Sequence, residues 1–454
     1  MKKMLAIVLA AACAVSLASC SAPVQTVSCY AQEPSTAQLA VPEPVSMPQY
    51  PDEEAYLSGK LDSGTYDALW NTWWEARQAR TANMTAPGTL DSYFTRIIRA
   101  LMQGMGEDNR VCSPLNVYMA LAMLAACTDG ESRQQLLSLL GTDSLAQLQK
   151  QTAQLWTENS WADGLVTSRL ANSIWLRDGY SYQQDTLDTL ADSFYASAFS
   201  GEMGSDAYNQ ELQDWINSNT GSLLAEQAGK LKLSPQTVLA LISTIYYSAQ
   251  WTDRFYDSAN TQDTFHAPSG DKTATFMHSS QNGTLYSGDG FTAISLPLRG
   301  SGSMWLLKPD SGVTAESLLQ SDEALAFLLS DGSWSQTQNA QIDLSIPKFD
   351  IASDLDLTKA LQSLGVTDIF DLSISDFTPL STADPLYVSK ARHAARVKID
   401  EEGCEAAAYT VISVEAGAAL PEAVVPFTLD APFVFAVTGV DGLPLFVGLV
   451  NQPE

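Results

Sequence analysis

The sequence predicts one large α+β domain preceded by an N-terminal extension, and three observations support this prediction. The chain has 454 residues, 45% of them hydrophobic, which is enough to bury a large core. Apolar residues recur at helical spacing between residues 94 and 105, and a second apolar run follows a Ser-Pro pair at 113–114. Residues 400–417 instead show the two-residue alternation of a strand. Length alone does not exclude several smaller domains.

The chain begins with the features of a secretion signal, because two lysines precede an apolar run from Met4 to Ala18. That run is short for a membrane span. The following Leu17-Ala18-Ser19-Cys20 is similar to the bacterial lipobox, in which the Cys carries a lipid. We therefore expect residues 1–19 to be a lipoprotein signal peptide and Cys20 to anchor the protein in the bacterial cell envelope, on the extracytoplasmic side or at the cell surface. The alternatives are a lipid on Cys13 or a plain signal peptide.

Residues 20–51 are expected to form a Pro-rich tether, because residues 21–51 contain six prolines. An extended segment of this composition could reach on the order of 100 Å. Residues 52–87 are expected to form a short helical extension, in which aromatic residues recur at helical spacing (Tyr66, Trp70, Trp73 and Trp74). We expect this helix to pack on the main domain. An aromatic binding site is the alternative.

The main domain is expected to span residues 88–454. Several of its stretches resemble, in order, segments of the serpin family: NRVCSPLNVYMALAMLAAC, RLANSIWLRDGY, VLALISTIYYSAQWTDRF, LYVSKARHAARVKIDEEG, PFTLDAPFVFAV and LPLFVGLVNQP. The resemblance implies the serpin fold, with a large central, mostly antiparallel sheet, surrounding helices and an exposed reactive-centre loop at about residues 401–426. It also implies that a target protease cuts this loop, which then inserts into the central sheet.

The predicted loop has the side-chain pattern that insertion requires. One face carries only small or apolar residues: Cys404, Ala406, Ala408, Thr410, Ile412, Val414 and Ala416. A strand of about 13 residues would be roughly 43 Å long, well beyond the usual length. An acidic helix broken at Gly403 is the alternative, since runs of Ala favour helix.

The resemblance assigns roles within this loop. The hinge comprises Glu402, Gly403, Cys404, Glu405, Ala406, Ala407 and Ala408. The bond to be cut is placed between Gly417 and Ala418, with Ala416 and Ala419 as neighbouring candidates because the segment is longer than in familiar members. These small, uncharged side chains suit a shallow elastase-like specificity pocket, whereas a trypsin-like pocket requires Arg or Lys.

The resemblance also places Ser113, Pro114 and His393 in the buried region where the strands must part, and Trp251 at the end of the sheet. Ser113 and His393 raise the alternative of a hydrolase. The sequence has only three His and lacks a Gly-x-Ser-x-Gly or His-Glu-x-x-His motif, so we expect no enzyme. Family members usually have Asn where this chain has Ser243, so the resemblance does not determine how easily these strands separate.

Charge and cysteines limit the partners. The 24 basic and 52 acidic residues give a net charge of −28, which disfavours nucleic acids and anionic membranes. The helix that binds sulfated polysaccharides in some serpins corresponds to a stretch with only Lys150, so no polyanion cofactor is expected. No CxxC or Cys/His spacing suggests zinc, so no metal is expected either. After the signal, Cys29, Cys112, Cys127 and Cys404 remain, with no required disulfide.

The sequence thus predicts a secreted, lipid-anchored, monomeric inhibitor that irreversibly traps elastase-like serine proteases as acyl-enzymes. The alternative from another class is a non-inhibitory serpin-fold protein that binds a partner at the cell surface.

Overall fold

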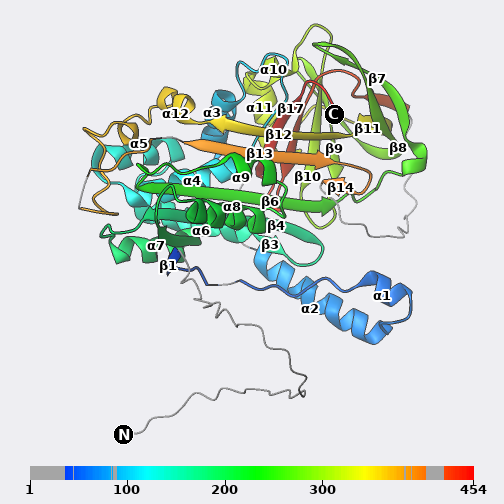
Figure 1. Ribbon diagram of the computed structural model, residues 1–454. Coiled ribbons are helices and arrows are strands. Elements are labelled where there is room, and N and C mark those ends of the chain that lie inside the picture. Colours follow the sequence, from blue (N-terminus) through cyan, green and yellow to red (C-terminus); the bar gives the residue numbers. More distant parts are fainter. Residues whose placement is uncertain are drawn as a thin grey trace, which may run out of the picture. The chain divides into compact units, whose positions relative to one another are not determined.

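The computed structural model describes residues 36–43, 45–82, 84, 89–382, 385–389, 391–404 and 424–453. In these residues two β-sheets and surrounding helices build the α+β architecture that the sequence predicts (Figure 1). The predicted signal peptide and Cys20 lie outside the described residues, as do hinge residues Glu405 to Ala408 and the candidate reactive bond at residues 416–419.

Sheet A contains β14, the start of the predicted loop, and all its pairs are antiparallel except that of β4 with β5. Its strands are, in order, β1 (Thr36–Ala40), β5 (Ala196–Gly201), β4 (Val166–Arg177), β6 (Leu239–Gln250), β14 (Gly403–Cys404), β13 (Arg392–Ile399) and β12 (Phe349–Asp356), with β3 (Trp161–Ala162) paired to β4.

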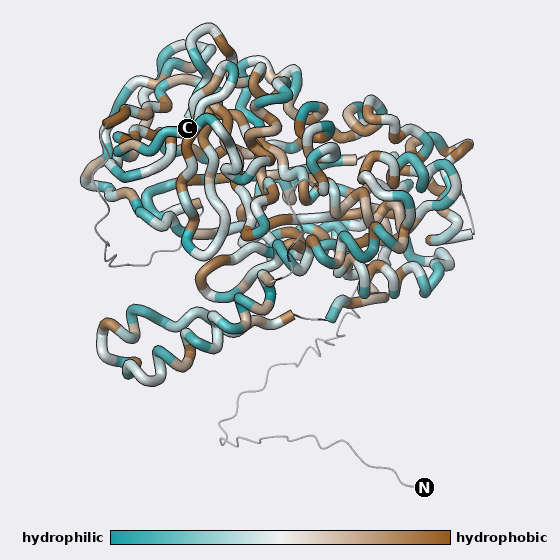
Figure 2. Tube along the Cα trace, turned by 180° about the vertical axis from the view of Figure 1, so that it is seen from behind, coloured by the Kyte–Doolittle hydropathy of each residue, from teal (hydrophilic) through white to brown (hydrophobic). Residues whose placement is uncertain are grey.

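Sheet B packs the C-terminal strands into the core. Its strands are, in order, β15 (Val424–Thr428), β11 (Thr337–Pro347), β8 (Gly270–Gly288), β9 (Phe291–Pro297), β10 (Ser303–Pro309), β16 (Phe433–Thr438), β17 (Pro444–Val450) and β2 (Arg110–Cys112), with β7 (Thr261–Ala267) paired to β8. Every residue of β16 and β17 is buried, which explains their nearly unbroken apolar sequences. Figure 2 shows hydrophobic stretches concentrated inside the body of the two sheets.

The helices surround the sheets. They are α1 (Glu53–Leu57), α2 (Ser63–Thr81), α3 (Asp91–Leu101), α4 (Pro114–Cys127), α5 (Gly130–Leu140), α6 (Leu145–Asn159), α7 (Gln184–Phe194), α8 (Asp206–Asn219), α9 (Ala225–Lys230), α10 (Ala315–Leu318), α11 (Asp322–Leu329) and α12 (Thr358–Ser363), with 3-10 turns η1 (Asp257–Ala259) and η2 (Asp368–Phe370). None of the described helices has the length and apolar character needed to cross a membrane.

Helix α4 begins where the Ser-Pro pair predicts. The Ser113 hydroxyl accepts a hydrogen bond from the Asn116 amide, and Pro114 occupies the first turn, where its missing N–H costs nothing. Cys112 lies just before this buried helix and Cys127 is its last residue, and burial raises the pKa of both thiols to about 12. Both cysteines are fully buried in the core.

The folded part of the chain begins earlier than the sequence predicts. Residues 36–40, inside the range expected to be a tether, form β1 and pair with β5 at the edge of sheet A. Edge pairing satisfies backbone groups of both strands and requires no apolar side-chain pattern. The tether prediction is therefore wrong for residues 36–40. It rests on the proline content of the whole range, which gives no sign of a short strand.

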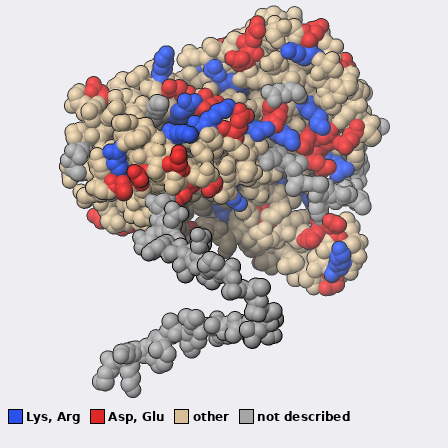
Figure 3. Space-filling model, in the orientation of Figure 1, with Lys and Arg blue, Asp and Glu red and all other residues tan. Residues whose placement is uncertain are grey.

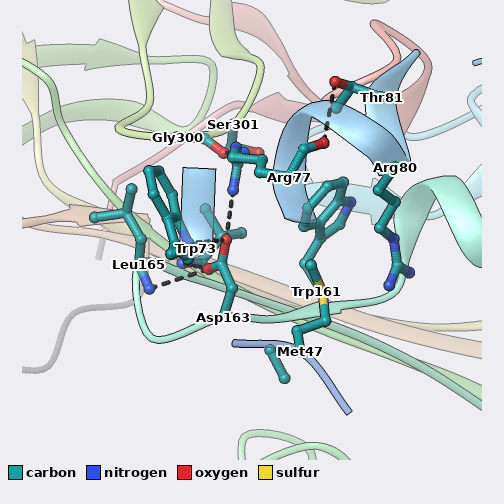
Figure 4. Close-up of polar contacts among 12 residues, drawn as sticks. Met47, Trp73, Arg77, Arg80, Thr81, Trp161, Asp163, Leu165, Gly300 and Ser301 are labelled. Carbon is teal, nitrogen blue, oxygen red and sulfur yellow. Dashed lines mark hydrogen bonds and ion pairs between the residues drawn. The ribbon is translucent and has the colours of Figure 1, made fainter. Parts of the chain in front are cut away.

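The aromatic helix of the extension is α2, and one side of it packs on the domain as predicted. Trp73 is buried at 5% exposure, whereas Trp74 is 41% exposed. The Asp163 carboxylate, fully buried in the turn between β3 and β4, accepts hydrogen bonds from Trp73 Nε1 at 3.0 Å and Arg77 Nη1 at 2.5 Å (Figure 4). Arg77 also donates to the Gly300 carbonyl between β9 and β10, so the extension contacts both sheets.

Candidate functional site

The candidate site begins at β14, the only described part of the predicted loop that lies inside sheet A. Gly403 pairs with Gln250 of β6, and Cys404 lies opposite Ala249 of β6 and Ile399 of β13. Figure 1 shows β14 at one end of these two long strands. The start of the loop therefore already occupies the position of a strand between β6 and β13.

Gly403 is required here by close packing. A Cβ atom on this residue would lie 2.3 Å from the Ala249 carbonyl oxygen and 2.8 Å from the Gln250 Cα. Both neighbours are backbone atoms that cannot move aside cheaply. Cys404 follows as a buried side chain at 3% exposure, as expected for a small residue that enters the core.

Polar contacts hold this end of the sheet closed around Trp251. The Trp251 amide donates to the Glu402 carbonyl at 3.0 Å, and its indole Nε1 donates to the Asp400 carbonyl at 2.8 Å. Glu401 is paired with Lys348, whose Nζ lies 2.6 Å from its carboxylate. Burial alone would raise the pKa of Glu401, but hydrogen bonds from Lys348 and Asn260 outweigh it and lower the pKa.

Ser113 and His393 meet in the middle of the molecule, but through the Ser113 backbone. The Ser113 amide donates to His393 Nε2 at 2.8 Å, so the neutral ring carries its proton on Nδ1. Burial lowers the pKa of His393 to about 4, against a partly opposing effect of Asp354. This contact ties the start of α4 to β13.

A second contact ties the same helix to β6. The Asn116 side chain donates to the Ser243 carbonyl at 3.1 Å. Because the acceptor is a backbone oxygen, the link between α4 and β6 does not depend on the Ser243 side chain. The departure from the usual Asn at this position therefore leaves this anchor intact.

A cavity of about 360 Å³ lies at the other end of the two strands. Its lining includes residues 241–244 of β6, residues 392–394 of β13, and Asn116 on α4. Ile216 of α8 and Ala228 of α9 also line it. Among the described residues, no strand joins β6 to β13 here, so β14 alone bridges them.

The arrangement of Ser113 and His393 does not match a hydrolase. The Ser113 residue is 0% exposed, and its Oγ accepts a hydrogen bond from the Asn116 amide. The lone pair of His393 Nε2 faces the backbone amide and is not available to take a proton from Ser113 Oγ. This is the geometry of a helix cap that holds a strand.

Sequence reasoning missed the polar residues that close the sheet around β14, namely Arg254, Asn260, Lys348, Asp400 and Glu401. Their partners are far apart in the chain, and several contacts use backbone carbonyls. The available signal was the acidic run before Gly403 in a segment that is otherwise buried. Asn116 was also missed, although its position in the first turn of α4 places it beside Ser113.

The comparisons with known proteins agree with this architecture. The family model described as "Serpin (serine protease inhibitor)" matches residues 90–453. Among similar curated proteins, Serpin-ZX from Arabidopsis thaliana is 28% identical over 365 residues, which cover 76% of this chain and 93% of that protein. The leukocyte elastase inhibitor of Equus caballus is 27% identical over 376 residues, covering 80% and 99%.

Solved structures show the same fold. The thermophilic serpin tengpin in its native state matches with a TM-score of 0.71 at 23% identity, over 82% of this chain and 97% of that one. The complex of thyroxine-binding globulin with thyroxine matches with a TM-score of 0.70 at 20% identity, over 81% and 99%. The family model begins at residue 90, so the α1–α2 extension lies outside it.

Proposed function

Because the chain belongs to the serpin family, whose members are generally inhibitors of serine proteases, we propose that it irreversibly inhibits elastase-like serine proteases. One observation supports this most directly. The start of the loop occupies a strand position between β6 and β13, and a cavity continues between the same strands. Sheet A has a place for one further strand, and the loop enters it at β14.

The proposed reaction is a normal first half of proteolysis followed by a trap. The protease serine Oγ attacks the Gly417 carbonyl carbon, and the bond to the Ala418 nitrogen breaks after that nitrogen receives a proton from the protease histidine. Gly417 remains esterified to the protease. The freed segment then inserts between β6 and β13 faster than water hydrolyses the ester, and the displaced serine loses its oxyanion hole.

The specificity part of the proposal rests on side-chain size. Residues 416–419 are small and uncharged, which suits a shallow apolar pocket and gives a pocket with a buried carboxylate nothing to bind. The similar horse protein is named an elastase inhibitor, which agrees with this choice. We therefore expect elastase to be inhibited and trypsin to be inhibited poorly.

The test is a denaturing gel of the protein mixed with elastase. We expect an adduct that survives denaturation, and mass analysis of the released C-terminal peptide should place the cut at Gly417-Ala418. Ala406→Arg should convert the inhibitor into a substrate, because its side chain lies on the face that must enter the core and would bury an unpaired charge. Ala407→Arg is the matched control, since its side chain lies on the opposite face.

Complete cleavage with undiminished elastase activity would leave a non-inhibitory serpin-fold binding protein as the function. Equal adduct yields from the two arginine variants would show that the alternation of residues 404–416 does not govern insertion. These outcomes separate the fold from the inhibitory activity.

We also propose that the inhibitor acts as a monomer held at the bacterial cell surface by a lipid on Cys20. The lipobox-like sequence and the prolines after it support this location. Cys20→Ala should move the protein from the membrane fraction to the soluble fraction, and its retention in the membrane would contradict the assignment. Cys13→Ala is the control, because it leaves Cys20 in place.

A further inference from the structure

A second cavity, of about 400 Å³, lies on the outer side of sheet A and belongs neither to the loop nor to its insertion site. Strand β4 pairs with β3 through residues 167–168 and with β5 from Asn172 onward. Residues 169–171 of β4, which lie between these two pairings, have no strand partner on this edge among the described residues. The cavity lies along this edge, and Pro42 and Met47 of the N-terminal segment cover it.

The N-terminal segment is fixed on both sides of the cavity. Before it, β1 pairs with β5. After it, the Tyr50 amide donates to the Asp163 carbonyl at 2.6 Å, beside β3. The segment therefore spans the gap from β5 to β3 and completes a pocket that the family-matched part of the chain alone would leave open.

Aromatic rings give this pocket flat walls. The rings of Trp156 and Tyr195 stack with centroids 3.7 Å apart and an interplanar angle of 8°. Trp161 and Trp215 line the pocket from two further elements. The Trp156 indole donates to the Leu170 carbonyl at 2.9 Å, which holds this stack against the open edge of β4. Such surfaces favour a flat apolar ligand.

Two arginines line the same pocket without a carboxylate partner among the described residues. Arg80 donates to the carbonyls of Thr157 and Ser160, and Arg169 donates to the Ser218 carbonyl at 3.0 Å. Burial lowers the pKa of Arg80, and Asp163 offsets this only in part. On the face shown in Figure 3, many Lys and Arg side chains lie beside Asp and Glu side chains, whereas neither Arg80 nor Arg169 is in an ion pair among the described residues.

Two further polar residues of the lining bear on the choice of ligand. Glu43 is an exposed carboxylate contributed by the covering segment. Asn172 is 2% exposed, and its Nδ2 donates to the Phe194 carbonyl at 2.7 Å. Its Oδ1 has no hydrogen-bond partner in the described part of the chain, so a donor on a ligand could satisfy it.

We propose that this pocket binds a small planar organic anion, an aromatic carboxylate or sulfonate. The ring system would lie against the Trp156–Tyr195 stack, and the anionic group would face Arg169 and Arg80. This binding is independent of the loop and of protease inhibition.

The test uses anilinonaphthalene sulfonate, a fluorescent planar anion, with the intact protein carrying Cys20→Ala so that no lipid contributes. We expect one saturable site. Arg169→Gln should weaken binding about tenfold, because it removes an opposite charge from an exposed position that the fold does not need. N-phenyl-naphthylamine, a neutral analogue, should bind with little change on Arg169→Gln.

A second variant and a control locate the site. Ala171→Leu should reduce the binding of both probes by filling the pocket at the edge of β4. Arg392→Gln changes an arginine of the β6–β13 cavity and should leave the affinity unchanged. The proposal is overturned if no saturable binding is seen, if Arg392→Gln weakens binding in place of Arg169→Gln, or if the neutral probe depends equally on Arg169.

Discussion

The two sides of strand β6 differ in how they are paired. Towards β4, β6 is paired from Leu239 to Ala249. Towards β13, the described residues supply only the two-residue strand β14, at Gln250 and Ala249. Among the described residues, β6 is therefore paired along its length towards β4 but only at one end towards β13.

This difference shows where free energy remains to be gained. At the paired end, Trp251, Glu401 and Lys348 hold the strands around β14. At the other end, Ser113 and Asn116 anchor β13 and β6 separately to α4, so the helix holds the strands in place without joining them to each other. A strand added between them would satisfy backbone groups on both sides at once.

The largest expected effect is therefore a rise in melting temperature after the loop is cut. An added strand with on the order of ten net hydrogen bonds, each contributing about 1 kcal/mol, should stabilise the sheet strongly. For a domain of this size we expect Tm to rise by about 10 °C or more. Calorimetry of the intact and elastase-cleaved proteins measures this directly.

Ala406→Arg provides the matched comparison for this experiment. Its cleaved form should gain much less, because the charged side chain opposes insertion. A cleaved wild-type protein that melts no higher than the intact one would contradict the idea that β6 can pair with a further strand towards β13.

Much of this contrast could be predicted from the sequence, and the rest could not for physical reasons. The Ser-Pro start of α4 and the aromatic helix α2 have local signals, and both are present. The contacts that make the two ends of β6 different are long-range. The Trp251 indole meets the carbonyl of Asp400, 149 residues away, and a backbone acceptor leaves no mark in the sequence.

The outer edge of sheet A is a second example. Strand β1 is bound to β5 by backbone pairing, and its side chains are partly exposed, so neither periodicity nor hydrophobicity identified it. The family resemblance could not help, because the family model begins at residue 90. By contrast, the resemblance brought Ser113 and His393 together correctly, although the atom involved was the Ser113 amide.

The next largest effect concerns that outer edge. Arg77→Met should leave the Asp163 carboxylate buried without its cation and should destabilise the docked extension by about 3 kcal/mol. Faster deuterium exchange of the Tyr50 amide, which donates to Asp163, should report the loss. Lys230→Met removes an exposed pair with Glu226 and should leave both the stability and the exchange of the Tyr50 amide unchanged, because solvent screens such a pair.

If Tyr50 exchanged no faster in Arg77→Met than in the wild type, the buried ion pair would not be what holds the extension on sheet A. In that case the edge pairing of β1 would be the dominant contact.

A smaller effect is expected at the end of β6 that is paired with β14. Gly403→Ala should reduce the free energy of unfolding by about 2 kcal/mol, because the new methyl group meets the Ala249 carbonyl. Exchange of the Trp251 amide should become faster as β14 leaves its place. Gly229→Ala is the control, since a Cβ there meets nothing within 4 Å and Ala favours the helix. Equal stabilities of the two variants would mean that β14 is not held by close packing.

The last effect, of similar size but confined to acid conditions, is a pH dependence at His393, which links α4 to β13. Its pKa is about 4 in the folded protein because of burial, below the ordinary value of 6.5. Between pH 4 and pH 6.5 the His393 side chain is therefore protonated in the unfolded chain but neutral in the folded protein. The free energy of unfolding falls as pH decreases from about 6.5 to about 4. Asp441, whose pKa burial raises to about 6, contributes in the opposite direction in an overlapping range.

Comparing variants at the same pH separates the two groups. His393→Gln keeps an acceptor for the Ser113 amide but cannot be protonated, so its loss of stability from about pH 7 to about pH 4.5 should be smaller by about 2 kcal/mol. Urea unfolding at the two pH values measures this difference, and His266→Gln, at an exposed imidazole, serves as the control. The same loss in His393→Gln and the wild type would show that acid does not act through the link between α4 and β13.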